Sequence, residues 1–257
     1  MTDPTTAVNP GGGAGFRLEV LEDYERLSEA ASEVICAEAR EKPRMLICLA
    51  TGASPTRTYE LLSLKRGAHP GLFEQVRILK LDEWGGLARG AAGSCESYLR
   101  KHVIRPLGIG EDRFVGFTGD TDSEEVECDR LHAWVAEHGP IDLCVLGLGA
   151  NGHLGLNEPG RVLSPFAHRA VLSEATRGHA MLSTSGAKPT GGLTLGLAEI
   201  LQSRQILMLV NGAHKRQPLR RLLQKEIACE FPASFLWLHP RVILLCDREA
   251  FAANPEP

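Results

Sequence analysis

Short apolar runs alternate along the chain with longer segments whose apolar residues recur at helical spacing. The apolar runs predict buried strands at 45–50, 76–81, 114–117, 141–147, 205–210 and 242–246. The helical spacing predicts helices near 22–40, 55–65, 94–103, 123–138, 173–182, 193–201 and 213–225. Apolar strands separated by helices are typical of a parallel sheet that is covered on both faces. We therefore predict a single-domain, Rossmann-like α/β fold with a mainly parallel sheet.

The two ends of the chain differ from the middle in composition. Residues 1–15 contain two prolines and a run of three glycines, and residues 251–257 close with Asn-Pro-Glu-Pro. Segments of this kind bury too little apolar surface to fold. We expect a disordered arm at 1–15, one catalytic domain at 16–250 and a frayed tail at 251–257.

Composition narrows the class of protein. The chain has 257 residues, 43% of them hydrophobic, which is enough for a substantial core. Its net charge is −4 and its basic residues are dispersed, so we expect no nucleic-acid partner. The seven cysteines form no C-x-x-C pair, and Cys48, Cys144 and Cys246 lie in apolar runs typical of core thiols.

No run approaches the roughly 18 apolar residues of a membrane span, and no signal peptide is visible. We expect a cytoplasmic protein without a membrane partner.

A glycine-rich segment follows the predicted strand at 141–147. Gly147, Gly149 and Gly152 match G-x-G-x-x-G, which would indicate a dinucleotide site if a helix began at the third glycine. Gly155 and Pro159 follow closely and disfavour such a helix. The segment instead predicts a loop at the carboxyl end of a strand, where α/β sheets bind ligands.

This loop carries a titratable pair, His153 and Glu158. A carboxylate can orient an imidazole and keep it suited to general acid–base catalysis, whereas a lone loop histidine is usually without function. A metal site is disfavoured, because neither H-x-x-x-H spacing on a helix nor a Cys/His cluster occurs here.

Polar residues follow three further predicted strands. Asp82 and Glu83 are adjacent carboxylates, and their repulsion and burial would raise the pKa of one of them, although a turn-capping aspartate is the alternative. Thr51, Gly52, Ala53 and Ser54 precede a helix whose N-terminus would suit a phosphate, although an ordinary serine cap is equally compatible. Lys215 could add a point charge to that phosphate or could be a solvated surface lysine.

Several segments together resemble one family, in order, over about residues 20 to 248. They are Leu-Ala-Thr-Gly-Ala-Ser-Pro-Thr-Arg-Thr-Tyr (49–59), Lys-Leu-Asp-Glu-Trp (80–84), Gly-Ser-Cys-Glu-Ser-Tyr-Leu (93–99), the glycine-rich segment 142–160, Val-Asn-Gly-Ala-His-Lys (210–215) and Pro-Ala-Ser-Phe-Leu-Trp-Leu-His (232–239). The chain resembles the glucosamine-6-phosphate deaminase/isomerase family. Within that family, its sequence is most similar to the galactosamine-6-phosphate branch.

The resemblance implies a sugar-phosphate isomerase/deaminase without a redox cofactor. It makes Asp82 the base that moves a proton between C2 and C1 of the opened sugar. It makes His153 the group that opens the pyranose ring and Glu158 the residue that holds this histidine. Thr51 to Ser54 and Lys215 match phosphate-binding positions. With an amine at C2, the isomerised species is hydrolysed to a ketose phosphate and ammonia.

Two positions depart from the family pattern. Asn151 occupies a position that is often aspartate, so it can hydrogen-bond to the pair but supplies no charge. Residues 187–192 lack an arginine where relatives commonly place a phosphate contact. The short C-terminus does not imply the allosteric hexamer of longer relatives, and we expect a monomer or small homo-oligomer.

Two other functions stay open. A 6-phosphogluconolactonase has a related fold and a similar histidine loop, but its pattern would not be expected to keep Glu158. A non-catalytic sugar-phosphate sensor is compatible with Asn151 and disfavoured by Asp82, His153 and Glu158 together.

Overall fold

The structure is a computed structural model that describes residues 7–8, 15–186 and 188–252. In this part of the chain, eight strands form a sheet in the order β1-β2-β11-β10-β7-β3-β4-β6. The strands are β1 (Ala7–Val8), β2 (Phe16–Leu21), β3 (Leu46–Leu49), β4 (Arg77–Lys80), β6 (Phe114–Val115), β7 (Leu143–Gly147), β10 (Gln205–Val210) and β11 (Val242–Asp247). Neighbours are parallel except for β1 and β2. The predicted mainly parallel sheet is therefore confirmed.

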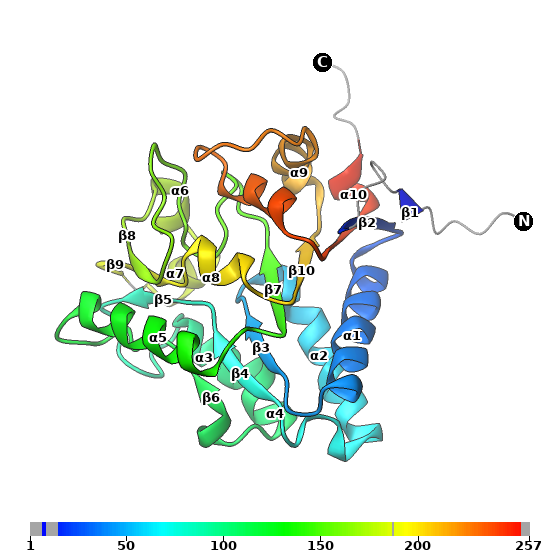
Figure 1. Cartoon of the computed structure of the whole chain (residues 1–257), viewed down its shortest axis with the longest axis horizontal. Coiled ribbons are helices and arrows are strands. Elements are labelled where there is room, and N and C mark those ends of the chain that lie inside the picture. Colours follow the sequence, from blue (N-terminus) through cyan, green and yellow to red (C-terminus); the bar gives the residue numbers. More distant parts are fainter. Residues whose placement is uncertain (1–6, 9–14, 187, 253–257) are drawn as a thin grey trace, which may run out of the picture.

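Helices cover both faces of this sheet (Figure 1). One face packs against α1 (Tyr24–Glu41), α2 (Ala53–Ala68), α3 (Cys95–Leu99), a π-helical turn (Arg100–Ile104) and α4 (Arg105–Leu107). The other packs against α5 (Glu124–His138), α8 (Leu197–Leu201), α9 (Arg216–Leu223) and α10 (Arg248–Phe251). Within the described residues, no helix combines the length and apolar character that crossing a bilayer requires.

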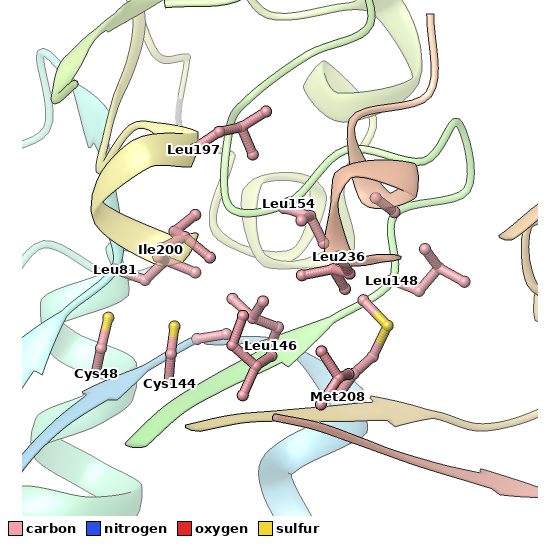
Figure 2. Packing of buried hydrophobic residues seen from close by; sticks show 14 of the residues in the cluster. Cys48, Leu81, Cys144, Leu146, Leu148, Leu154, Leu197, Ile200, Met208 and Leu236 are labelled. Atoms are coloured by element: carbon pink, nitrogen blue, oxygen red, sulfur yellow. The ribbon is translucent and has the colours of Figure 1, made fainter. Parts of the chain in front are cut away.

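Successive strand residues face opposite layers of the core. In β3, Leu46 and Cys48 belong to one apolar cluster, and Ile47 and Leu49 belong to the other. This alternation follows from the two-residue period of a strand, and it explains why the strand is apolar throughout. Cys48 lies opposite Cys144 of β7 in the parallel register, and Figure 2 shows both thiols in the packed interior.

A second, three-stranded antiparallel sheet was not predicted. It contains β5 (Asp82–Gly85), β9 (Gly191–Thr194) and β8 (His168–Ala170), in that order. The helix predicted at 193–201 is therefore wrong at its start, since β9 ends at Thr194 and α8 begins at Leu197.

Two further regions of the chain differ from the prediction. Strand β2 was not predicted, although its sequence alternates apolar and polar residues. The helix predicted at 173–182 is two short helices, α6 (Glu174–Arg177) and α7 (Ala180–Ser185), and Gly178 caps the first.

The predicted arm and tail lie mostly outside the described residues, at 1–6, 9–14 and 253–257. Two residues of the arm, Ala7 and Val8, form β1 and pair with Glu19 and Leu18 of β2. At the other end, Phe251 belongs to α10, so the helix extends one residue into the segment expected to fray.

Candidate active site

One cavity of about 290 Å³ opens at the carboxyl ends of β3 and β7. Nearly all site residues predicted from the sequence line it: Thr51, Gly52, Ala53, Ser54, Asp82, Asn151, His153 and Lys215. Glu158 is the exception, because it lies behind His153 rather than on the wall. The fold thus collects residues from four separate chain segments at the sheet edge where α/β proteins bind ligands.

The wall formed by the start of α2 is an open helix N-terminus. Gly52 is the N-cap, with φ of 114°, and no side chain caps the helix. The helix begins at Ala53, two residues before the predicted start, so Ser54 lies inside its first turn and the serine-cap alternative is wrong. The first N–H groups of a helix have no partner within it, and they carry the positive end of its dipole. This wall can bind a phosphate.

Lys215 reaches the same cavity from the 3-10 turn Ala213–Lys215 that precedes α9. Its Nζ donates a hydrogen bond to the Leu148 carbonyl oxygen over 2.6 Å, and burial lowers the pKa of the ammonium. An ammonium has three donors, so this contact leaves capacity for an anion. The solvated-surface alternative for Lys215 is wrong.

Asp82 reaches the cavity from β5, where it pairs with Thr194. Its side chain is almost fully buried, and its Oδ1 has no hydrogen-bond partner among the described residues. Burial, and next the charge of Glu83, raise the pKa of Asp82 to about 6, although His153 opposes the shift. Such a carboxyl group can both accept and return a proton near neutral pH.

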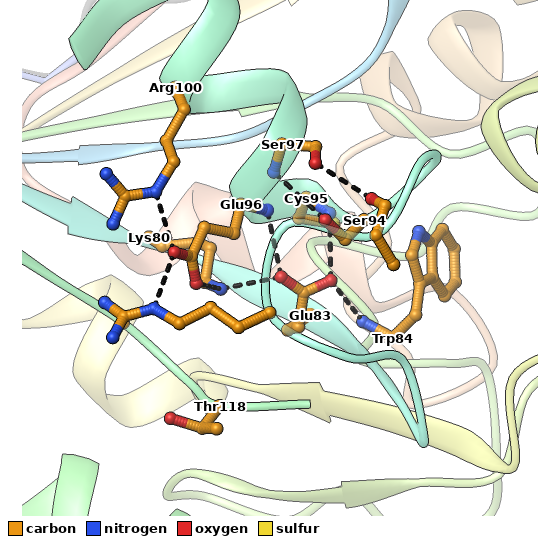
Figure 3. Close-up of polar contacts among 12 residues, drawn as sticks. Lys80, Glu83, Trp84, Ser94, Cys95, Glu96, Ser97, Arg100 and Thr118 are labelled. Carbon is orange, nitrogen blue, oxygen red and sulfur yellow. Dashed lines mark hydrogen bonds and ion pairs between the residues drawn. The ribbon is translucent and has the colours of Figure 1, made fainter. Parts of the chain in front are cut away.

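Glu83 does not line the cavity, and its carboxylate belongs to a polar network (Figure 3). Its Oε1 accepts hydrogen bonds from the backbone N–H groups of Trp84 and Cys95, at 2.9 and 2.8 Å. Its Oε2 accepts one from the Glu96 backbone and pairs with Lys80 Nζ over 2.6 Å. Glu83 therefore fastens β5 to the start of α3, which holds Asp82 in place. The aspartate turn cap considered for this segment is wrong, since Asp82 lies in a strand.

The glycine-rich loop after β7 is compact and contains no helix, so the dinucleotide geometry is absent from it. The N–H of Gly149 donates to the His153 carbonyl oxygen over 3.1 Å. Gly152 has φ of 89°, and any side chain there would collide with the Phe231 ring. The Asn151 side chain also accepts a hydrogen bond from the His153 backbone N–H, at 3.1 Å. These contacts fix the position of the histidine.

Glu158 and Asn151 support the His153 ring from behind. Glu158 Oε2 lies 3.8 Å from His153 Nδ1 and accepts a hydrogen bond from Asn151 Nδ2 over 2.8 Å. Burial alone would raise the pKa of Glu158. Hydrogen bonds with His153, Thr176 and Asn151, together with the charge of His153, outweigh burial and lower the pKa to about 2. Glu158 is therefore ionised at neutral pH. The arrangement orients the ring with a negative charge, as an acid–base histidine requires.

Trp84 and His214 also line the cavity, and both lie in segments that the sequence indicated at strand ends, whereas Thr176 and His179 lie outside every segment that the sequence indicated for the site. Trp84 lies two residues after Asp82 in β5, and the period of the strand places both on the cavity side. Thr176 and His179 belong to the segment of α6 and α7, where the sequence showed only an ordinary helical pattern. Among the described residues, no group of three or more His, Cys, Asp or Glu side chains is placed to hold a metal ion.

Comparisons with known proteins identify the family of the chain. Residues 22–244 match the family described as glucosamine-6-phosphate isomerases/6-phosphogluconolactonase. The chain is 45% identical to the Escherichia coli K12 protein named "Putative deaminase AgaI", over 90% of this chain and 91% of that one. It is 34% identical to glucosamine-6-phosphate deaminase 1 of Bacillus subtilis 168, over 93% of this chain and 100% of that one.

Solved structures give the same result. The fold superposes on a monomeric glucosamine-6-phosphate deaminase with a TM-score of 0.85 and 33% identity, covering 91% of this chain and 98% of that one. A 6-phosphogluconolactonase from Trypanosoma brucei shares the fold, with a TM-score of 0.71 and 21% identity over 91% of this chain and 96% of that one. The chain therefore belongs to the glucosamine-6-phosphate isomerase/6-phosphogluconolactonase family.

Proposed function

We propose that this chain is an amino-sugar-6-phosphate isomerase/deaminase. It converts galactosamine 6-phosphate and water to tagatose 6-phosphate and ammonia, or glucosamine 6-phosphate and water to fructose 6-phosphate and ammonia. The observation that carries the proposal is Asp82, whose buried carboxyl group has an unpartnered oxygen and a pKa of about 6 in the cavity that also holds His153.

Each part of the cavity has a role in this reaction. The N–H groups of Thr51 to Ser54 and the Lys215 ammonium bind the 6-phosphate. His153 transfers a proton at the ring oxygen, which opens the pyranose, and Glu158 with Asn151 holds the imidazole. Asp82 removes the proton from C2 and returns it to C1, so the C2 amine becomes an imine that water hydrolyses.

Two features favour the deaminase over the lactonase and the sensor. Hydrolysis of a lactone moves no proton between carbon atoms. Isomerisation of an amino sugar does, and a carboxyl group with a pKa near 6 suits that proton transfer. A binding protein has no need for an unpartnered buried carboxyl oxygen, which costs folding free energy. The identities above 30% to proteins named deaminases support the same choice.

The test is ammonia release by the purified full chain from each amino-sugar phosphate, without added metal or nucleotide. We expect release from at least one of them, and the ratio of the two kcat/KM values assigns the C4 epimer. Hydrolysis of 6-phosphogluconolactone alone would instead identify a lactonase. Binding of both sugars without turnover would identify a sensor.

We further propose that residues 16–250 form the catalytic domain and that the enzyme acts in the cytoplasm as a monomer or small homo-oligomer. The monomeric solved relative supports this assembly. Light scattering of the full chain gives the mass, and a mass of six chains or more would contradict it.

A further inference from the structure

Few cationic side chains line the phosphate end of the cavity. A phosphate monoester carries a charge between −1.5 and −2 near neutral pH. Among the described residues, Lys215 is the only lysine or arginine that lines the cavity. The remaining basic side chains on its wall are histidines: His153, His179 and His214. His153 is committed to Glu158, which leaves His179 and His214 as further groups that could contact the phosphate.

His179 faces the open N-terminus of α2. Its Nε2 lies 3.9 Å from the point where a Cβ would stand on Gly52, the N-cap of that helix. The ring thus borders the space in front of the free N–H groups of the first turn. By contrast, the His214 ring lies beside Gly212 of its own turn.

The protonation of His179 is set by its place at the start of α7. Its Nδ1 accepts a hydrogen bond from the Met181 backbone N–H over 3.3 Å, which caps the helix. Because Nδ1 accepts, the hydrogen of a neutral ring lies on Nε2. Burial, and then the charges of His153 and Lys215, lower the pKa of His179, so the free protein holds the ring neutral.

The ring is also held in orientation. It lies against the Trp84 indole, with centroids 5.8 Å apart and planes inclined by 47°. The Nε2 atom has no hydrogen-bond partner among the described residues, whereas Nδ1 has one. A preorganised donor without a partner therefore borders the anion-binding wall, and its position costs little further ordering when a ligand binds.

We propose that His179 binds the substrate phosphate, donating its Nε2–H to a phosphate oxygen opposite the N–H groups of α2. The inference deepens the proposed function and rests on it for the identity of the ligand. The phosphate is then held from three sides: the α2 N-terminus, the Lys215 ammonium and the His179 imidazole. Because His179 caps α7, phosphate binding also holds the start of this short helix at the cavity wall, which Ala180 lines.

The test compares two substitutions at this position. His179→Asn keeps an acceptor that caps α7, since asparagine is a strong N-cap, but its side chain is too short to reach the phosphate. His179→Gln keeps an N–H donor with a longer reach. His69→Ala is the matched control, because His69 is exposed and lies at the far end of the same helix α2.

Calorimetry measures the Kd of fructose 6-phosphate, and the ammonia assay measures KM and kcat. We expect His179→Asn to raise Kd and KM about 10- to 100-fold, the range for a hydrogen bond to a charged group, with a much smaller change in kcat. His179→Gln recovers part of the affinity, and His69→Ala matches the unmodified chain. Thermal unfolding confirms that each variant is folded.

Two results would overturn the inference: a folded His179→Asn variant with unchanged Kd, or one that loses kcat at unchanged KM. The calorimetric measurement of Kd does not depend on turnover. If the chain released no ammonia but bound fructose 6-phosphate in a His179-dependent manner, the proposed function would fail while the phosphate contact would stand.

Discussion

Asn151 donates its side-chain amide N–H to Glu158 Oε2 over 2.8 Å. An ionised aspartate at this position would have no hydrogen to donate. The amide thus stabilises the ionised form of Glu158 without adding a second negative charge. Glu158 Oε2 lies 3.8 Å from His153 Nδ1, so this carboxylate supplies negative charge beside the ring.

We expect Asn151→Asp to move the pH profile of the enzyme. It places a second carboxylate against Glu158, and two like charges at hydrogen-bond distance raise the pKa of one of them. The acid limb of kcat/KM for ammonia release should therefore shift to higher pH. Asn151→Ala, which removes the hydrogen bond without adding charge, is the control. Superimposable profiles for the Asp variant and the unmodified chain would contradict a repulsion between the two carboxylates.

Asp82→Asn should separate activity from stability. The loss of the proton acceptor should lower kcat by roughly 10²–10⁴-fold. The pKa of Asp82 is about 6 in the folded protein against an ordinary value of 3.8, so ionisation destabilises the fold as pH rises through 6. The variant should then be more stable than the unmodified chain at pH 8, by on the order of 3 kcal/mol, and equally stable near pH 3. Urea unfolding at both pH values measures the difference, and a gain independent of pH would show that ionisation of Asp82 is not its cause.

Glu158→Gln should show the opposite dependence on pH. The pKa of Glu158 falls from 4.5 to about 2 on folding, so its ionised form stabilises the protein above pH 4.5 and this contribution is lost as pH falls toward 2. The variant should have a lower Tm at pH 7, and the difference should shrink at lower pH. Calorimetric scans from pH 7 to pH 3 test this, with equal Tm values at pH 7 as the contradicting outcome.

Lys80 and Glu83 form a buried ion pair, with side chains that are 1% and 3% exposed. Lys80→Met leaves the Glu83 carboxylate without its counter-ion, at a cost of about 3–5 kcal/mol in the free energy of unfolding. The double variant with Glu83→Gln removes the stranded charge, so the two effects should not add. Urea unfolding of the single and double variants measures the coupling, and strict additivity would show that the pair is not coupled.

The strand and loop at 143–158 could be predicted because their determinants are local. Leu143 to Leu148 are apolar, and the following glycines and Pro159 exclude a long helix. The same holds for the start of α2, where Gly52 and Pro55 lie close together. Local patterns therefore indicated the pair His153 and Glu158, whereas for Asp82 and Lys215 they left a turn cap and a surface lysine open, and the family resemblance decided between these alternatives.

Strand β5 could not be predicted, because nothing local favours a strand at Asp82-Glu83. Its hydrogen bonds go to β9, more than 100 residues away, and the carboxylate of Glu83 is satisfied by Lys80 and the start of α3. The cavity residue His179 was missed for a related reason. Its short helix reaches the site only because β8 and β9 join it to β5.

The pairing of β5 also determines which of two neighbouring carboxylates faces the cavity. Alternate residues of a strand face opposite sides, so a slip of one residue against β9 would turn Glu83 toward the cavity and bury Asp82 beside Lys80. The four contacts on the Glu83 carboxylate oppose that slip. A residue outside the cavity wall thus keeps its neighbour's carboxylate on that wall, and a longer side chain is kept from taking its place.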